Sequence, residues 1–431
     1  MKKLILAAGA LSMLLTACGK KKESTEPSTE EVTKIHQTAL TIDPHIDLRE
    51  DFDAAGNDAG AFTEDQFDLV KLDSGKLDVA TIALFADPLR RTPENIVLAR
   101  KQVDSKLAAI RNFVKKHPDK LEFVRSTTDI EKLAADGKHG ILLSFLNALS
   151  LGKDTSLIDH YYKEGVRVFG FAHAGNNDWT DSSRPSEGLG DKPNEAGGLT
   201  AIGKAAVPIL NRKGVIIDVS QLTTDALNQT LELSKAPVIA SHSAVRSIVD
   251  NSRNLSDAEL KAIAAKGGVV HIVAFAAYLK DTAALKEDYK KQIFEPLGLQ
   301  VGKDNPKEKL DSAGYRKYKD AYRTFSRNEW KYASLDDYLN AVDYAVKLIG
   351  IDHVGFSADF NHGGGVKGYA HVGEGPNITA ALLKRGYSEA DIQKLWGGNF
   401  LRVFKEVEKA AQTTSLASNT AVGQSEIAKN R

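Results

Sequence analysis

Short apolar segments rich in β-branched residues recur along this chain and alternate with longer amphipathic segments. Eight apolar segments stand out, at residues 40–47, 77–85, 140–146, 166–173, 214–220, 237–243, 268–275 and 353–359. Several are apolar without interruption, which is typical of parallel strands covered by helices. Segments with a helical pattern lie between them, at 92–116, 156–164, 201–212, 226–235 and 256–266. Eight strand–helix units in one α/β domain predict a (β/α)8 TIM barrel.

An open, doubly wound sheet is the alternative fold. It is weakened because no glycine-rich phosphate-binding sequence follows the first apolar segment. One connection breaks the regular spacing, namely residues 276–350 between the seventh and eighth strands. It contains a Lys- and Tyr-rich stretch at 309–332 and a helical pattern at 334–348. We expect a long insertion here, with its first part lying over the mouth of the barrel.

The overall composition excludes several classes of protein. Lys and Arg together number 57, as do Asp and Glu, so the formal net charge is zero. This balance argues against a strongly basic nucleic-acid-binding protein. The 42% apolar content is sufficient for a folded core. A single cysteine excludes an internal disulfide and a zinc site built from cysteines.

The N-terminal segment has the pattern of a secretory signal peptide. Lys2 and Lys3 precede an apolar stretch of about a dozen residues, which ends in Leu-Thr-Ala-Cys at Cys18. This ending resembles the lipobox of bacterial lipoproteins, in which the cysteine becomes the first residue and carries acyl chains. An ordinary signal peptide is the alternative. We therefore expect a lipid-anchored protein of the bacterial cell envelope, and Gly19 favours the outer membrane facing the periplasm.

The same pattern divides the chain into four parts. Residues 1–17 are expected to be the signal peptide, and residues 18–33, rich in Lys, Glu, Ser and Thr, a disordered tether. Residues 34–410 are expected to form the barrel, and residues 411–431 a polar tail.

Polar residues stand where the predicted strands end, and these ends meet at one mouth of a (β/α)8 barrel. They are His45, Asp47, His173, Gln221, His242 and Asp359. His45 and Asp47 are two residues apart, so on a strand they share one face. Imidazole and carboxylate ligands suit zinc with an open position for water. By itself the His45–Asp47 pair is more typical of a local hydrogen-bonded pair, but the further histidines and Asp359 favour a metal site.

Three other histidines have less distinctive positions. His271 lies inside the seventh predicted strand, where a buried structural role is the alternative to a functional one. His362 and His371 lie in the glycine-rich stretch after Asp359 and are candidates for contact with a substrate.

The sequence resembles the membrane (renal) dipeptidase family of zinc peptidases over about residues 38–408. The resemblance is carried by DPHIDL at 43–48, KEGVRVFGFAHAGNNDWTDS at 163–182, KAPVIASHSAVRSIVDNSRNLSD at 235–257 and GIDHVGFSADF at 350–360. GLTAIGKAAVPILNRKGVIIDVS at 198–220 and LLKRGYSEADIQKLWGGNFLRVFKEVE at 382–408 extend it. It implies a barrel of the metal-dependent hydrolase type, commonly dimeric, that hydrolyses dipeptides with a metal-activated water.

The resemblance also implies roles for individual residues. His45 and Asp47 match ligands of a first metal, and His242 matches a ligand of a second. His173 matches the histidine that contacts the substrate and the developing oxyanion. Arg253 matches the arginine that binds the substrate's C-terminal carboxylate. Asp359 matches the aspartate that binds the substrate amine and transfers protons.

Two positions depart from the family pattern. Leu146 stands where the family has a glutamate that bridges two metals, and Gln221 stands where it has a second-metal histidine. Leucine cannot ligate a metal, and glutamine is a weak substitute for histidine. Since two cations repel strongly without an anion between them, we expect one Zn²⁺ and consider a second doubtful. Hydrolysis of another small amide or ester, and a binding lipoprotein without catalysis, remain alternatives.

Overall fold

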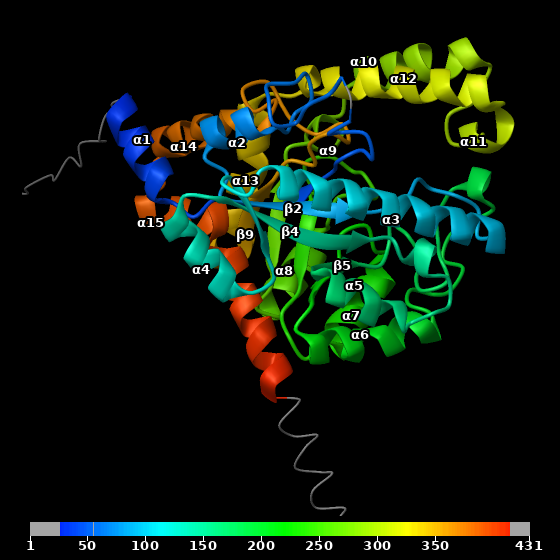
Figure 1. Cartoon of the computed structure of the whole chain (residues 1–431), viewed down its shortest axis with the longest axis horizontal. Helices are drawn as coiled ribbons and strands as arrows, with labels where there is room; N and C mark the ends of the chain where they lie inside the picture. Colours follow the sequence, from blue (N-terminus) through cyan, green and yellow to red (C-terminus); the bar gives the residue numbers. More distant parts are fainter. Residues whose placement is uncertain (1–25, 55, 414–431) are drawn as a thin grey trace, which may run out of the picture.

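The computed structural model of the chain describes residues 26–54 and 56–413 (Figure 1). The signal peptide, Cys18, the first part of the expected tether and the tail after residue 413 lie outside the described residues. No helix in the described part of the chain is both long enough and apolar enough to cross a membrane.

Eight parallel strands form the barrel, and each corresponds to one of the eight apolar segments. They are β1 (Ile42–Ile46), β2 (Val79–Leu84), β4 (His139–Leu146), β5 (Val166–Gly170), β6 (Ile216–Asp218), β7 (Ile239–Ser243), β8 (Val269–Val273) and β9 (Val354–Ser357). Their order in the sheet is their order in the chain. The Asp47 N–H donates to the Phe360 carbonyl across 3.1 Å, which links the first strand to the last. The predicted (β/α)8 barrel is confirmed.

A ninth strand, β3 (Leu121–Val124), was not expected from the sequence. It pairs in parallel with β4 but lies off the path of the barrel. It has four residues, and Glu122 and Phe123 are only partly buried, so it carries neither the length nor the continuous apolar character of the barrel strands. The helix after it, α4 (Thr127–Asp136), was missed with it.

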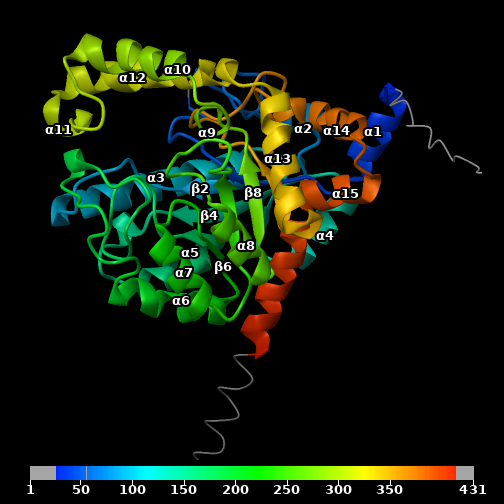
Figure 2. The same ribbon diagram turned by 180° about the vertical axis from the view of Figure 1, so that it is seen from behind.

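The helices that connect the strands surround the barrel (Figures 1 and 2). They include α2 (Leu69–Gly75), α3 (Pro93–Lys116), α5 (Leu157–Glu164), α6 (Ala201–Lys213), α7 (Thr224–Leu233), α8 (Asp257–Ala265), α13 (Leu335–Ile349), α14 (Gly375–Lys384) and α15 (Glu389–Gln393). Several begin at a side-chain cap. Thr92 caps α3, with Pro93 in the first helical turn. Ser256 and Glu259 form a capping box at the start of α8.

The expected insertion lies between β8 and β9. It contains α9 (Ala276–Leu279), α10 (Ala283–Tyr289), α11 (Pro306–Lys309) and α12 (Ser312–Glu329), and α13 follows it. The Lys- and Tyr-rich stretch forms α12, and its Tyr322 and Phe325 contact Tyr289 of α10. Figure 2 shows α10 and α12 lying beyond the end toward which the β8 arrow points. The insertion therefore lies on the same side of the barrel as the carboxyl ends of the strands.

The N-terminal boundary of the folded part differs from the expectation. Helix α1 (Thr29–Thr38) begins inside the segment expected to be a tether, so that prediction is wrong for residues 29–33. Ser28 caps this helix, and Ile35 anchors it in the core. The ring of His36 on this helix is buried between the Thr379 hydroxyl and the Gly75 carbonyl. The polar residues 29–33 are the exposed first turns of a packed helix.

At the other end, a helix over residues 399–413 extends past residue 410. The expected tail boundary at 411 is thus a few residues too early.

Candidate active site

His45, Asp47 and Asp359 meet at the mouth of the barrel. His45 lies in β1, Asp47 comes directly after it and Asp359 follows β9, and the closure of the barrel makes these strand ends neighbours. His45 Nε2 lies 3.8 Å from Asp47 Oδ1 and 3.6 Å from Asp359 Oδ1. One ligand atom from each of the three residues lies within 4.8 Å of the others.

The donor set of these three residues fits a metal ion. All three are buried, and Oδ1 of both aspartates lacks a hydrogen-bond donor. Ligand atoms that lie about 2.0–2.2 Å from zinc can be at most about 4.4 Å apart. Both distances from His45 Nε2 satisfy this limit. A cation would also satisfy two buried oxygen atoms that are costly to leave unpaired.

Three strand ends at the mouth adopt a left-handed backbone conformation. Asn147, Gln221 and Asp359 have φ angles of 70°, 70° and 55°. Non-glycine residues seldom adopt positive φ, and residues that do so concentrate at functional sites. Each follows a barrel strand by one to three residues, so the chain turns sharply where a side chain must face the mouth.

His362, predicted as a substrate contact, lies beside the metal-site candidates. Its Nδ1 is 3.0 Å from Asp47 Oδ2, the oxygen of Asp47 that does not face His45. Burial alone would raise the pKa of Asp47, but the hydrogen bond and charge of His362 lower it below its usual value. Burial would lower the pKa of His362, and its bond to Asp47 raises it instead. His362 therefore fixes the orientation of the Asp47 carboxylate.

Asp359 has the opposite tendency. Burial raises its pKa, although the nearby imidazoles of His45 and His362 partly oppose this effect. Of the two aspartates at the mouth, Asp359 is therefore the one that more readily takes up a proton.

Leu146, which the resemblance aligns with a metal-bridging glutamate, ends β4 and is apolar. The side chain of Leu146 is buried in a small cluster with Ala83 and Phe85. No carboxylate reaches this point from β4, which agrees with the expectation from the sequence. A second metal at this point would therefore face an apolar side chain where it needs a carboxylate.

Gln221 and His242 contact each other directly at the neighbouring strand ends. Gln221 Nε2 lies 3.0 Å from His242 Nε2, and the His242 ring stacks on His45 with the ring centroids 3.7 Å apart. His242 Nδ1 lies 2.6 Å from the Ser241 hydroxyl, which bonds Asp218. Both ring nitrogens of His242 therefore already have partners. Burial lowers the pKa of His242 well below its usual value, so the ring is neutral.

His173 and Arg253 also face the site. His173 is buried against Phe85 and His362, and its Nδ1 has no partner. Burial lowers its pKa well below the usual value, and the charge of Arg184 lowers it further. Arg253 donates from Nη2 to the His242 carbonyl across 2.9 Å, while its Nε and Nη1 are buried without partners. The free N–H groups of Arg253 are available to an anionic ligand.

Two residues at the mouth were missed by the sequence reasoning. Lys106 on α3 is buried, with its ammonium 3.8 Å from the centre of the Phe85 ring, and its charge lowers the pKa of Asp47. The available signal was its position on the apolar stripe of α3, with Ala99, Val103 and Ile110. Arg184 donates from Nη2 to Gln221 Oε1 across 2.7 Å. It lies in a long loop, where no spacing rule points to it.

A third residue was missed on the insertion. The Glu329 carboxyl is buried at the end of α12 and lies against Gly363, where an added Cβ would be 2.7 Å from Oε2. Burial raises the pKa of Glu329 to about 8, and the charge of Asp359 contributes. The insertion therefore contributes an acidic group beside the loop that carries Asp359 and His362.

The remaining histidine candidates lie away from this cluster. His271 is buried within β8, where Nδ1 bonds the Ala240 carbonyl, and burial lowers its pKa to about 4. His271 therefore has the buried structural role that was the alternative to a functional one. His371 accepts a hydrogen bond from the Gly373 N–H, so it caps a turn.

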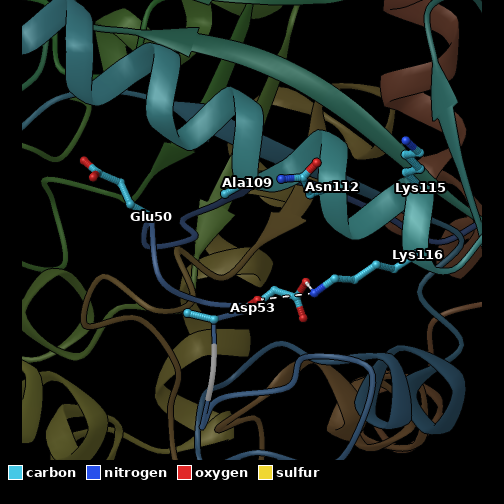
Figure 3. A pocket seen from close by; sticks show the side chains of 7 residues that line it. Glu50, Asp53, Ala109, Asn112, Lys115 and Lys116 are labelled. Atoms are coloured by element: carbon cyan, nitrogen blue, oxygen red, sulfur yellow. Dashed lines mark hydrogen bonds and ion pairs between the residues drawn. The ribbon is translucent and has the colours of Figure 1, made fainter.

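A hollow between α3 and the loop after β1 is a separate feature (Figure 3). It is lined by Glu50, Asp53, Ala54, Ala109, Asn112, Lys115 and Lys116. Lys116 Nζ reaches Asp53 Oδ2 across 2.5 Å, as Figure 3 shows. The charges of Lys116 and Asp53 thus neutralise each other. The hollow contains none of the residues predicted for the site.

Comparisons with known proteins place the chain in a family. The profile of the membrane dipeptidase family (peptidase family M19) matches residues 29–418. The probable dipeptidase PvdM from Pseudomonas aeruginosa is 41% identical, with a TM-score of 0.79 over 88% of this chain and 98% of that one. A metallopeptidase from Rhodobacter sphaeroides, solved with a phosphinate mimic of L-Ala-D-Ala, shares the fold at 18% identity, with a TM-score of 0.65 over 86% of this chain and 99% of that one.

A curated relative is the dipeptidase tcpJ of Claviceps purpurea. It is 26% identical over 306 residues, which are 70% of this chain and 59% of the relative. This chain thus spans little more than half the length of that relative. Since the family profile covers nearly the whole chain, the chain belongs to the membrane dipeptidase family, peptidase family M19, whose members are metallodipeptidases.

Proposed function

We propose that this protein hydrolyses the peptide bond of dipeptides with a single bound zinc ion. The observation that carries the proposal is the group of His45, Asp47 and Asp359, with two buried aspartate oxygens that have no donor. These three residues would hold the ion. When bound, the metal would supply an activated water molecule near neutral pH. One metal is favoured because Leu146 is apolar and both ring nitrogens of His242 are occupied.

The protein's own residues would position the substrate. Arg253 has two buried N–H-bearing nitrogens without partners, and these suit the C-terminal carboxylate of a dipeptide. His173 is neutral, and its unpartnered Nδ1 is available for a polar group of the scissile peptide. Asp359 is the carboxylate that can accept the proton released when water attacks. The insertion, through α12, covers this mouth and limits the size of the substrate.

The experiment uses the full chain, purified in detergent. We would measure bound metal by mass spectrometry and assay a panel of L,L and L,D dipeptides before chelation, after chelation and after zinc is restored. We expect about one zinc per chain and turnover that disappears and returns with the metal. Folded, zinc-loaded protein without turnover on any dipeptide would contradict the proposal and favour another amide or ester, or a binding role.

We also propose that the chain is anchored through acyl chains on Cys18 to the cell envelope, in the outer membrane facing the periplasm. The support is the sequence of residues 1–18, with the only cysteine at the end of the apolar stretch. A Cys18→Ala variant should leave the membrane fraction and lose the mass of the acyl chains. Retention in that fraction with unchanged mass would contradict lipidation. A homodimer in solution is expected from the family resemblance, and sedimentation of the purified protein would test it.

A further inference from the structure

Arg184 lies next to Gln221, which the resemblance aligns with a metal-binding histidine. It belongs to the long connection that follows β5, and the chain around it is held on both sides. The Arg184 N–H donates to the Ser182 hydroxyl, and the Arg184 carbonyl accepts from the Gly175 N–H across 2.9 Å. The Ser183 N–H donates to the Gln221 carbonyl across 2.8 Å. The backbone therefore directs Arg184 toward the mouth before any ligand binds.

Hydrogen-bond direction follows from the charge of Arg184. The guanidinium can only donate, so Gln221 Oε1 accepts and Gln221 Nε2 is the donor toward His242 Nε2. His242 then carries its proton on Nδ1 and donates to Ser241, whose hydroxyl donates to Asp218. Each donor in this series of hydrogen bonds, from Arg184 to the Asp218 carboxylate, therefore faces an acceptor. The nitrogen of His242 that would ligate a second metal is occupied by an amide that Arg184 orients.

Arg184 has unused hydrogen-bonding capacity in the site. Its Nε is buried without a partner, and within residues 26–54 and 56–413 its guanidinium makes no ion pair with a carboxylate. Among neighbouring charges, Arg184 has the largest effect on His173, whose pKa it lowers, and it also lowers that of His242. A positive charge thus lies close both to His173, the predicted oxyanion contact, and to His242.

We propose that Arg184 supplies the positive charge that a second metal supplies elsewhere in this family, and that it stabilises the oxyanion formed during peptide hydrolysis. This inference rests on the proposed function. When the water oxygen bonds to the carbonyl carbon, the C=O π pair moves to the carbonyl oxygen and Asp359 accepts the water proton. When the tetrahedral species collapses, the C=O bond re-forms and the C–N pair leaves on nitrogen, which takes up that proton. Arg184 and His173 face the oxygen while it is negative.

The chemistry of the substitution explains why the two departures occur together. A second metal needs the glutamate at 146 as an anionic bridge and a histidine at 221. A guanidinium needs neither. It is held by the neutral amide of Gln221, and it requires no carboxylate at the position of Leu146, which lies in an apolar cluster with Ala83 and Phe85. A fixed donor aimed at a developing oxyanion stabilises the transition state more than the ground state.

The test compares Arg184→Ala and Arg184→Lys with Arg90→Ala, a matched control. Arg90 is an exposed arginine that pairs with Glu308 outside the site. For Arg184→Ala we expect kcat to fall about 100- to 1,000-fold, the usual loss for one oxyanion donor, with KM changed little and zinc content unchanged. Arg184→Lys should recover part of the loss, and added guanidinium ion should restore activity to Arg184→Ala. Arg90→Ala should resemble the unaltered protein.

A binding measurement separates this inference from the proposed function. A phosphinate mimic of a dipeptide carries a negative oxygen where the oxyanion forms. Arg184→Ala should weaken its binding by a factor similar to the fall in kcat, while the thermal midpoint stays near that of the unaltered protein. Unchanged kcat, a rise in KM alone, or loss of zinc would each overturn the role of Arg184. If the unaltered protein hydrolysed no dipeptide and did not bind the phosphinate, the proposed function itself would fail.

Discussion

Gln221 Nε2 lies 3.0 Å from His242 Nε2, so the two side chains that the family resemblance aligns with ligands of a second metal are hydrogen-bonded to each other. The pair is polar, neutral and buried, and Gln221 Oε1 accepts a hydrogen bond from Arg184. An amide with both its oxygen and its nitrogen engaged has little tendency to turn toward a metal. We therefore expect a hydrogen-bonded contact between two protein side chains, and not a second metal, at this position.

Restoring the family residues should restore a second metal. In the double variant Leu146→Glu, Gln221→His, a carboxylate and an imidazole replace the apolar and amide groups, and His242 Nε2 loses its amide donor. We expect bound zinc to rise from about one to about two per chain, as measured by mass spectrometry after dialysis. The single variants serve as controls and should stay near one. A double variant that also stays near one would show that other residues prevent the second site.

His362 should affect metal affinity without ligating the metal. It holds Asp47 through Oδ2, and removal of such an outer partner commonly weakens metal binding about 10- to 100-fold. We expect His362→Ala to lose zinc to a competing chelator by a factor in this range. His371→Ala, in the same stretch of chain but away from Asp47, should retain its zinc. Equal affinities in both variants would contradict the orienting role.

Arg253 should act on binding through the substrate carboxylate. Its buried Nε and Nη1 have no other partner. We expect Arg253→Ala to raise KM for dipeptides about 10- to 100-fold, in line with about 1.5–3 kcal/mol for charged hydrogen bonds. Dipeptide amides, which lack the carboxylate, should bind poorly to the unaltered protein and no worse to the variant. If the variant weakened both substrates equally, the arginine would not contact the carboxylate.

Glu329 should make the stability of the metal-free protein depend on pH. Its pKa is about 8 in the folded protein, against a usual value near 4.5. Between these two values the folded state binds a proton that the unfolded state has released. Stability contributed by this group is therefore lost as the pH rises through that window. Glu329→Gln should remove this loss, so that denaturant unfolding of the variant declines less between about pH 5 and pH 8. Parallel declines in both proteins would contradict the raised pKa.

The strands and their ends were predictable because they depend on local patterns. Continuous apolar runs identified all eight barrel strands, and their carboxyl ends carry, within the strand or shortly after it, His45, His173, His242 and Asp359. Once the strands are parallel and the barrel closes, these side chains must meet at one mouth. The short strand β3 and helix α1 were missed, because neither contains an uninterrupted apolar run and both depend on contacts with distant parts of the chain.

The local pattern was thus sufficient to indicate the barrel and the meeting of His45, Asp47 and Asp359 at its mouth. It could not indicate that Lys106, Arg184 and Glu329 enter the same site. Lys106 is directed inward by the rotation of α3, Arg184 by the path of a long loop, and Glu329 by the folding of the insertion over the mouth. A strand has a period of two that can be read from its own residues. The direction of a helix or loop side chain toward a distant site depends on packing that only the complete fold establishes.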